Sequence, residues 1–276
     1  MSPLSILMFL LVSFAVKAQI ETPQPSPSAT LIQKVGMAEI KIEYSRPSMK
    51  GRKIFGGDVV PYGEMWRTGA NTPTKVTVSD SITIMGKGLA KGSYVLMSKP
   101  GKDAWEIIFN KNPAASASSL KPEDDVVKVS VPTVALPFKV ETFTMGIGNI
   151  TNTGANLEIM WDNVSVAIPF TNDVDSKVMA QIKAKLAGPS QNDYQAMSVY
   201  YFETGKDLKE ALAYTNKAIA MGERFWMLRH KSLVQAKLGD KAGAIATAKR
   251  SMELANEAKN NDYVRMNEKS IAEWSK

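Results

Sequence analysis

Residues 157–168 read LEIMWDNVSVAI, and their period sets the fold expected for the first half of the chain. Large apolar residues occupy every second position on both sides of Asp162-Asn163: Leu157, Ile159, Trp161, Val164, Val166 and Ile168. Period two is typical of a β-strand with one buried face, and Asp and Asn are common turn residues. The stretch therefore predicts two antiparallel strands joined by a turn at Asp162-Asn163.

The same period returns in other short runs between residues 29 and 170. Its apolar faces are Ile40, Ile42 and Tyr44; Trp105, Ile107 and Phe109; Val127, Val129 and Val131; and Phe143, Met145 and Ile147. Gly, Pro and Asn separate these runs, as in antiparallel sheets. About nine strands in about 140 residues favour a two-sheet antiparallel β-sandwich.

Beyond Pro169 the pattern becomes helical. Asp173 or Asp175 can cap a first helix that ends before Gly188-Pro189. Further helices are expected at about 192–203, 207–220, 224–238, 241–258 and 262–274. The chain thus belongs to the segregated α+β class, with a sandwich at 29–170 and an all-α helical-hairpin domain at 171–276.

Two stretches of the helical part align at a spacing of about 33 residues, 205–212 with 239–245, and Ala218 then matches Ser251. Each stretch opens with a glycine that can end the first helix of a hairpin. The pattern resembles tetratricopeptide repeats, which present a surface to a protein partner. An ordinary helical bundle with accidental spacing is the alternative.

The N-terminus has the features of an export signal. Residues 4–16 are almost wholly apolar but too short to span a bilayer, and small residues precede a cleavage point after Ala18. Residues 19–28 form a Pro/Ser-rich linker. We therefore expect a periplasmic or secreted protein with no membrane span, and the absence of cysteine excludes lipidation and disulfides.

The charge pattern and the single histidine restrict the function classes further. The chain has a net charge of +7 but contains no block of like charges and no basic stripe, so we expect no nucleic-acid partner. His230 is expected to be packed or solvated, and neither a metal site nor a cofactor is indicated.

Residues 44–71 form a segment that is too long and too rich in arginine and aromatic residues for a simple connection. It contains YSRP at 44–47, GRKIFG at 51–56, PYG at 61–63 and WRTGAN at 66–71. With Gly92-Ser93-Tyr94, Trp105 and Glu141-Thr142, these motifs resemble DUF2911, a family common in secreted proteins of Bacteroidetes. The resemblance covers about residues 26–170 and implies no established activity. Where the family usually carries a Trp-Gly-x-Tyr-like segment, residues 112–119 read NPAASASS, so those aromatics are missing here.

Two interpretations of this segment remain open. Arg46 continues the apolar face of Tyr44, and Glu141 and Asp125 lead other apolar faces, so arginines could pair with buried carboxylates. Alternatively, the segment lines a pocket for a glycan or a small anionic ligand, with these candidate residues: Tyr44, Arg46, Arg52, Tyr62, Trp66, Arg67 and Asn71.

We expect a non-enzymatic binding or scaffold protein, and catalysis is the second hypothesis. A hydrolase of cell-envelope or dietary glycans would use Glu141 as acid or base, beside a second carboxylate such as Asp125 or Asp58.

Overall fold

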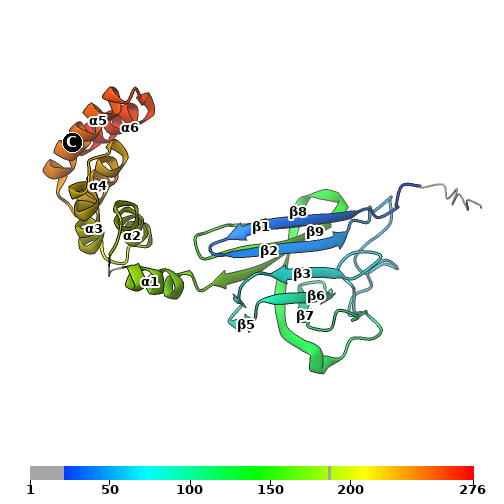
Figure 1. The fold of residues 1–276 in the computed structure, drawn as a ribbon. Coiled ribbons are helices and arrows are strands. Elements are labelled where there is room, and N and C mark those ends of the chain that lie inside the picture. The colour runs from blue at the N-terminus through cyan, green and yellow to red at the C-terminus, as the bar shows by residue number, and fades with distance from the viewer. Residues whose placement is uncertain (1–21, 186–187) are drawn as a thin grey trace, which may run out of the picture. The chain divides into compact units, whose positions relative to one another are not determined.

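The computed structural model describes residues 22–185 and 188–276. Two compact units divide the chain between Val174 and Asp175. Within the described residues, the first contains a nine-stranded antiparallel sheet and six helices follow it (Figure 1). The segregated α+β class is confirmed. The expected signal peptide, residues 1–18, lies outside the described residues.

The strands form one sheet in the order β1-β2-β3-β6-β7-β8-β9-β4-β5, with all neighbours antiparallel. Their bounds are β1 Ser28–Val35, β2 Ala38–Ser45, β3 Thr74–Val78, β4 Ile82–Ile84, β5 Lys87–Leu89, β6 Gly92–Lys99, β7 Ala104–Asn110, β8 Asp125–Gly148 and β9 Gly154–Asn172. A short 3₁₀ turn, Pro122–Asp124, precedes β8.

Strand β8 connects the two halves of the sheet. Its first part, from Asp125 to Pro132, pairs with β7, and its second part, from Thr133 to Gly148, pairs with β9. Side chains of β2, β3 and β7 meet those of β4 and β9 around a small void, which is lined by Ile40, Val76, Phe109, Ile82, Ile84, Leu157, Ile168 and Phe170. The sheet therefore folds over its own core, and its two halves face each other as expected for a sandwich, joined through β8.

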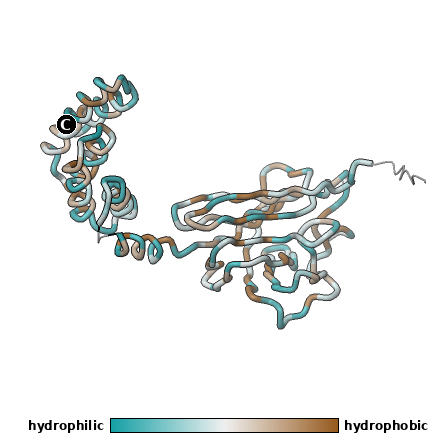
Figure 2. Tube along the Cα trace, viewed as in Figure 1, coloured by the Kyte–Doolittle hydropathy of each residue, from teal (hydrophilic) through white to brown (hydrophobic). Residues whose placement is uncertain are grey.

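Alternation along the strands places the apolar faces in this core, as Figure 2 shows by the alternation of brown and teal. Ile40, Ile42 and Tyr44 of β2 are buried, whereas Glu39 is exposed. Burial of one face sets the register, because a slip of one residue would reverse every side chain.

An aromatic cluster lies at the centre of the core. Trp66 stacks on Trp161 with ring centroids 6.0 Å apart and an interplanar angle of 17°. Phe143 meets both rings edge-on, at 5.3 and 5.7 Å. Phe55 and Trp105 complete the cluster. Residues 55 and 66 come from the long segment, so this segment is packed into the core at those two points.

The turn expected at Asp162-Asn163 is wrong, because both residues lie inside β9. The register shifts there: Ala135 pairs with Val164 and Val140 with Asp162, so β8 has extra residues opposite Asn163. Asp162 has a left-handed φ of 51°. Asp and Asn tolerate this conformation in a bulge as well as in a turn, which explains the misleading pattern.

The helices match the ranges expected from the sequence. Their bounds are α1 Val174–Lys185, α2 Gln191–Thr204, α3 Leu208–Ala220, α4 Phe225–Lys237, α5 Lys241–Glu257 and α6 Asn261–Trp274. Gly205 and Gly239 follow α2 and α4 with left-handed φ of 64° and 89°. None of the helices in the described ranges combines the length and apolar character needed to cross a membrane.

His230 of α4 is buried in the helical unit and bonds to Ser198 Oγ of α2 at 2.9 Å. Ser198 Oγ also donates to the carbonyl of Ala211 in α3 at 2.7 Å. The imidazole is thus a packing residue that connects two hairpins, as expected from the sequence. Burial lowers the pKa of His230 below its ordinary value of 6.5, and the bond to Ser198 opposes that shift.

Phe143→Ala should lower the free energy of unfolding by about 3–5 kcal/mol, since it removes a fully buried ring from the aromatic cluster. Urea unfolding followed by tryptophan fluorescence measures the change. Tyr62→Ala is the control, because the Tyr62 side chain is 39% exposed. A loss below about 1 kcal/mol for Phe143→Ala would contradict the central position of this ring.

The helical unit should lose stability as the pH falls from 7.5 to 5.5. Because the folded pKa of His230 is lowered, the unfolded chain binds a proton near pH 6.5 that the folded chain does not bind. Thermal unfolding followed by circular dichroism at 222 nm measures this loss. His230 is the single histidine, so His230→Gln should make the decline shallower; an unchanged slope would refute the assignment.

Candidate functional site

The long segment begins with a tight turn at Met49, Lys50, Gly51 and Arg52. Lys50 and Gly51 have consecutive left-handed φ of 48° and 73°, and Arg52 N donates to Met49 O at 3.0 Å. This is the geometry of a type I′ turn. Met49 N donates to Glu141 O at 2.8 Å, which joins the turn to β8.

Glu141 lies under this turn at a point where β8 bends. Its carboxylate Oε1 accepts the Lys50 N–H at 2.9 Å, and its backbone carbonyl accepts the Trp161 Nε1–H at 3.1 Å. The side chain is exposed. The inward orientation expected from the sequence is wrong, because the register shift between Val140 and Thr144 changes which face each residue occupies.

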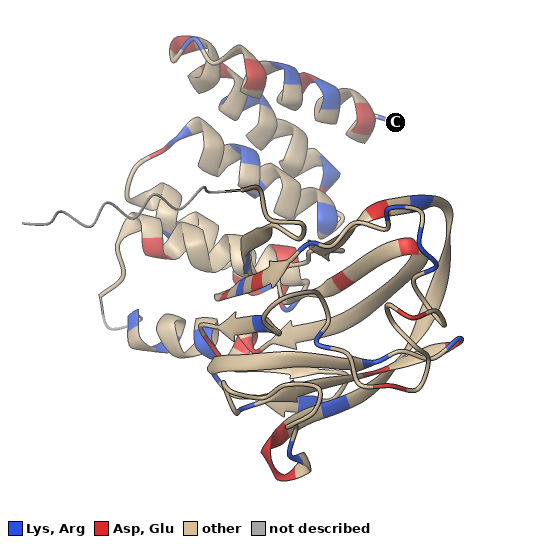
Figure 3. Cartoon of the chain, turned by 90° about the vertical axis from the view of Figure 1, so that its right-hand side faces the viewer, with Lys and Arg blue, Asp and Glu red and all other residues tan. Residues whose placement is uncertain are grey.

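A pocket of about 420 Å³ opens between the turn and the bend of β8 and β9. Its lining combines three cationic and two acidic side chains with one apolar one and a glycine: Arg52, Lys53, Lys139, Glu141, Asp162, Met49 and Gly51. Figure 3 shows that cationic and acidic residues are interspersed along the sheet unit. Opposite charges facing one small space make this pocket the candidate functional site, and it contains two predicted site residues, Arg52 and Glu141.

The bulge of β9 supplies the base of the pocket. The Asp162 side chain is 15% exposed, and its buried Oδ1 forms an ion pair with Lys139 Nζ at 3.4 Å without a hydrogen bond. The bulge, where Asp162 has a left-handed φ, therefore places this carboxylate beside Lys139 at the base of the pocket.

Arg52 is oriented by its own turn. Nε donates to Met49 O at 2.9 Å, and Nη2 donates to Ser48 O at 2.7 Å. Within residues 22–185 and 188–276, Arg52 Nη1 and Lys53 Nζ have no hydrogen-bond or ion-pair partner. The pocket thus offers two free cationic donors, together with the second oxygen of Glu141 as an acceptor.

Two other predicted ligand residues, Tyr44 and Trp66, lie in the core, whereas Tyr62 lies on the surface. Tyr44 OH both accepts from Met145 N at 3.2 Å and donates to Met145 O at 3.3 Å. Trp66 Nε1 donates to Gly69 O at 3.0 Å inside the aromatic cluster. Tyr62 is exposed and covers Gly56, where a Cβ would approach the Tyr62 ring to 2.4 Å. These three side chains do not line the pocket.

The remaining arginines bind backbone carbonyls and hydroxyls. Arg46 donates to Phe143 O at 3.1 Å and to Thr144 Oγ1 at 2.9 Å. Arg67 donates to Asn71 O at 2.7 Å, and Asn71 Nδ2 donates to Ser26 O at 3.0 Å. The sequence-based pairing of arginines with Glu141 or Asp125 is therefore wrong. A loop without regular structure leaves many carbonyls unpaired, and guanidinium groups satisfy them.

Asp125 lies outside the pocket, where its carboxylate accepts a hydrogen bond from Asn110 Nδ2 at 2.8 Å.

The site predicted from the sequence omitted Lys53, Lys139 and Asp162. The motif GRKIFG contains Lys53, so proximity to Arg52 could have suggested it. Lys139 and Asp162 carry no such signal, because only the pairing of β8 with β9 brings them together. Among the described residues, no cluster of three or more His, Cys, Asp or Glu side chains could hold a metal ion.

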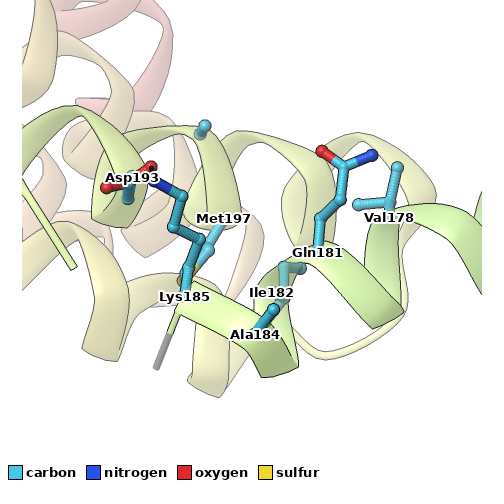
Figure 4. A pocket seen from close by; sticks show the side chains of 8 residues that line it. Val178, Gln181, Ile182, Ala184, Lys185, Asp193 and Met197 are labelled. Carbon is cyan, nitrogen blue, oxygen red and sulfur yellow. Dashed lines mark ion pairs between the residues drawn. The ribbon is translucent and has the colours of Figure 1, made fainter. Parts of the chain in front are cut away.

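A second hollow, of about 310 Å³, lies between α1 and α2 (Figure 4). Its lining is mostly apolar and includes Val178, Ile182 and Met197. Lys185 extends toward Asp193 at its rim, with 3.8 Å between Nζ and Oδ1 (Figure 4).

Comparison with known families establishes the identity of the sheet unit. The family described as "Protein of unknown function (DUF2911)" matches residues 26–170. The chain belongs to the DUF2911 family. The matched range includes strands β1 to β8 and all of β9 except its last two residues. It also contains every residue that lines the pocket, from Met49 to Asp162. The chain matches no curated protein and no solved structure.

Gly51→Ala in the DUF2911 domain should lower the free energy of unfolding by about 1–2 kcal/mol. A Cβ there meets no atom within 4 Å, so the loss comes only from the left-handed φ of 73°. Urea unfolding measures it. Gly88→Ala is the matched control, since Gly88 is equally open but has no left-handed φ. Equal stability of the two variants would contradict the turn geometry.

Proposed function

We propose that this protein is an exported, non-enzymatic binding module whose pocket beside Arg52 and Lys53 takes an anionic ligand. The observation that supports this function is the pair of free donors, Arg52 Nη1 and Lys53 Nζ, at one small pocket. Guanidinium and ammonium groups recognise carboxylate, sulfate and phosphate by charge-assisted hydrogen bonds. Export through a signal peptide cleaved after Ala18, in the manner of secreted Bacteroidetes proteins, is part of the proposal.

Glu141 and Asp162 in one pocket also make the glycan hydrolase a candidate function. Such an enzyme keeps one carboxyl group protonated in apolar surroundings. Glu141 instead is exposed and accepts an N–H, and Asp162 lies beside Lys139. These surroundings support binding better than acid catalysis.

For the helical unit we propose a tetratricopeptide-like scaffold that presents a surface to a protein partner. Two pairs of residues lie 33 positions apart and support the repeat, Ala211 with Ala244 and Ala218 with Ser251. All four residues are fully buried. Small residues at matching positions let successive helices pack closely. The apolar hollow of Figure 4 is a candidate contact for that partner.

Arg52→Ala/Lys53→Ala should weaken binding of polygalacturonate by about tenfold or more at 0.15 M NaCl, because two pocket cations are lost. Isothermal titration calorimetry on the full chain measures the affinity. Lys91→Ala/Lys102→Ala is the matched control, since it removes the same charge from two exposed lysines outside the pocket.

Equal losses in the two double variants would show that the polyanion responds only to the basic net charge of the chain. That result would refute the pocket. Glycan cleavage that disappears in Glu141→Gln would favour the hydrolase instead.

A further inference from the structure

We infer that the ligand of this pocket is an acidic sugar, that is, a sugar ring that carries a carboxylate or sulfate group. The inference rests on the proposed function and adds the chemical class of the ligand. It depends on three properties of the pocket: its charge balance, its free hydrogen-bonding atoms and the kinds of side chain in its wall.

The charge balance favours a ligand with a net negative charge. Three cations and two carboxylates line the pocket, and Lys139 already lies beside Asp162. Arg52, Lys53 and Glu141 remain, so positive charge is in excess. A zwitterion such as an amino acid would bring an ammonium group that only Glu141 could match, close to two repelling cations.

The free atoms call for both an anionic group and hydroxyl donors. Arg52 uses its Nε–H and one Nη2–H on backbone carbonyls, which leaves both Nη1 N–H groups and the second Nη2 N–H for an anion. Lys53 Nζ is a further donor. Glu141 uses Oε1 for the Lys50 N–H, which leaves Oε2 as an acceptor. Asp162 Oδ1 is buried and lies 3.4 Å from Lys139 Nζ, so Glu141 Oε2 is the acceptor that a ligand can reach. A ligand hydroxyl group can donate to it without adding charge.

The wall explains why the acidic substituent would be the anchor. The residues that line the pocket include no aromatic side chain, so stacking on a sugar face is not available. Met49 supplies one apolar contact, and Gly51 leaves open space where a Cβ would be. A neutral sugar would have only hydroxyl contacts, whereas an acidic sugar gains the two cations as well. The volume of about 420 Å³ suits a small ligand.

Titrations with four small probes at fixed ionic strength test this class. D-Glucuronate carries ring and anion, acetate carries only the anion, D-glucose carries only the ring, and L-alanine is the zwitterion. Backbone amide NMR shifts of Lys50 and Gly51 report binding, because the Lys50 N–H contacts Glu141 directly. We expect D-glucuronate to bind at least tenfold more tightly than the other three probes. Glucose 6-sulfate, a further probe, should bind as tightly as D-glucuronate, because the proposed class includes both carboxylated and sulfated sugars.

Glu141→Gln separates recognition of the ring from recognition of the anion. The Gln carbonyl can still accept the Lys50 N–H, so the turn is kept. We expect Glu141→Gln to lose most of the preference for glucuronate over acetate while acetate binding persists, and Arg52→Ala to weaken binding of both probes. The thermal midpoint of each variant checks the fold.

The outcomes distinguish the two proposals. Equal affinity for acetate and glucuronate overturns the inference that the ligand is a sugar, but it leaves the proposed anion-binding site intact. Tightest binding of alanine overturns the acidic-sugar class, and equal binding of glucose and glucuronate overturns the role of the cations. No shift with any acidic probe, together with no pocket-dependent binding of polygalacturonate, overturns both.

Discussion

The contact between Trp161 and Glu141 supports both the core and the candidate site. The Trp161 ring stacks on Trp66 in the centre of the sheet unit, while its Nε1–H holds the Glu141 carbonyl. A buried indole needs a partner for its single donor, and the bent part of β8 supplies it. One side chain thus couples the packing of the core to the position of the pocket carboxylate, since Glu141 in turn holds the Lys50 N–H.

Irregular strand pairing creates the pocket. A regular pair of strands would continue the ladder and alternate its side chains between core and solvent. Extra residues in β8 opposite Asn163 interrupt this alternation, and Asp162 adopts a left-handed φ at the same place. Bulges commonly lie near functional sites, where they re-aim side chains. Here the bulge brings Lys139 and Asp162 to one side of the type I′ turn, where Arg52 and Lys53 complete a mixed-charge surface.

The two units use different physical means to form a core. The DUF2911 domain packs large aromatic and branched residues between the layers of a folded sheet. The helical unit combines a smaller apolar cluster that includes Met197, Tyr201 and Tyr214 with small buried residues such as Ala211, and with hydrogen bonds between helices through Ser198 and His230. Small side chains allow close helix packing, but they bury less apolar surface. Buried polar contacts therefore matter more for the specificity of the helical packing.

The amino-acid pattern alone was enough to assign the helices and many of the strands, because period two, helical spacing and capping residues are local properties. It placed six helices and the buried faces of Ile40, Trp105 and Val129 correctly. It failed where distant segments meet: the Asp162-Asn163 turn is a bulge, Arg46 has no carboxylate partner, and Lys139 went unnoticed as a pocket residue. These points were settled only in the folded chain, because strand register and loop anchoring depend on contacts between residues that are distant in sequence. The paired residues are 22 and 29 positions apart at the β8–β9 bulge, and the contacts of Glu141 and Arg46 span 91 and 97 positions.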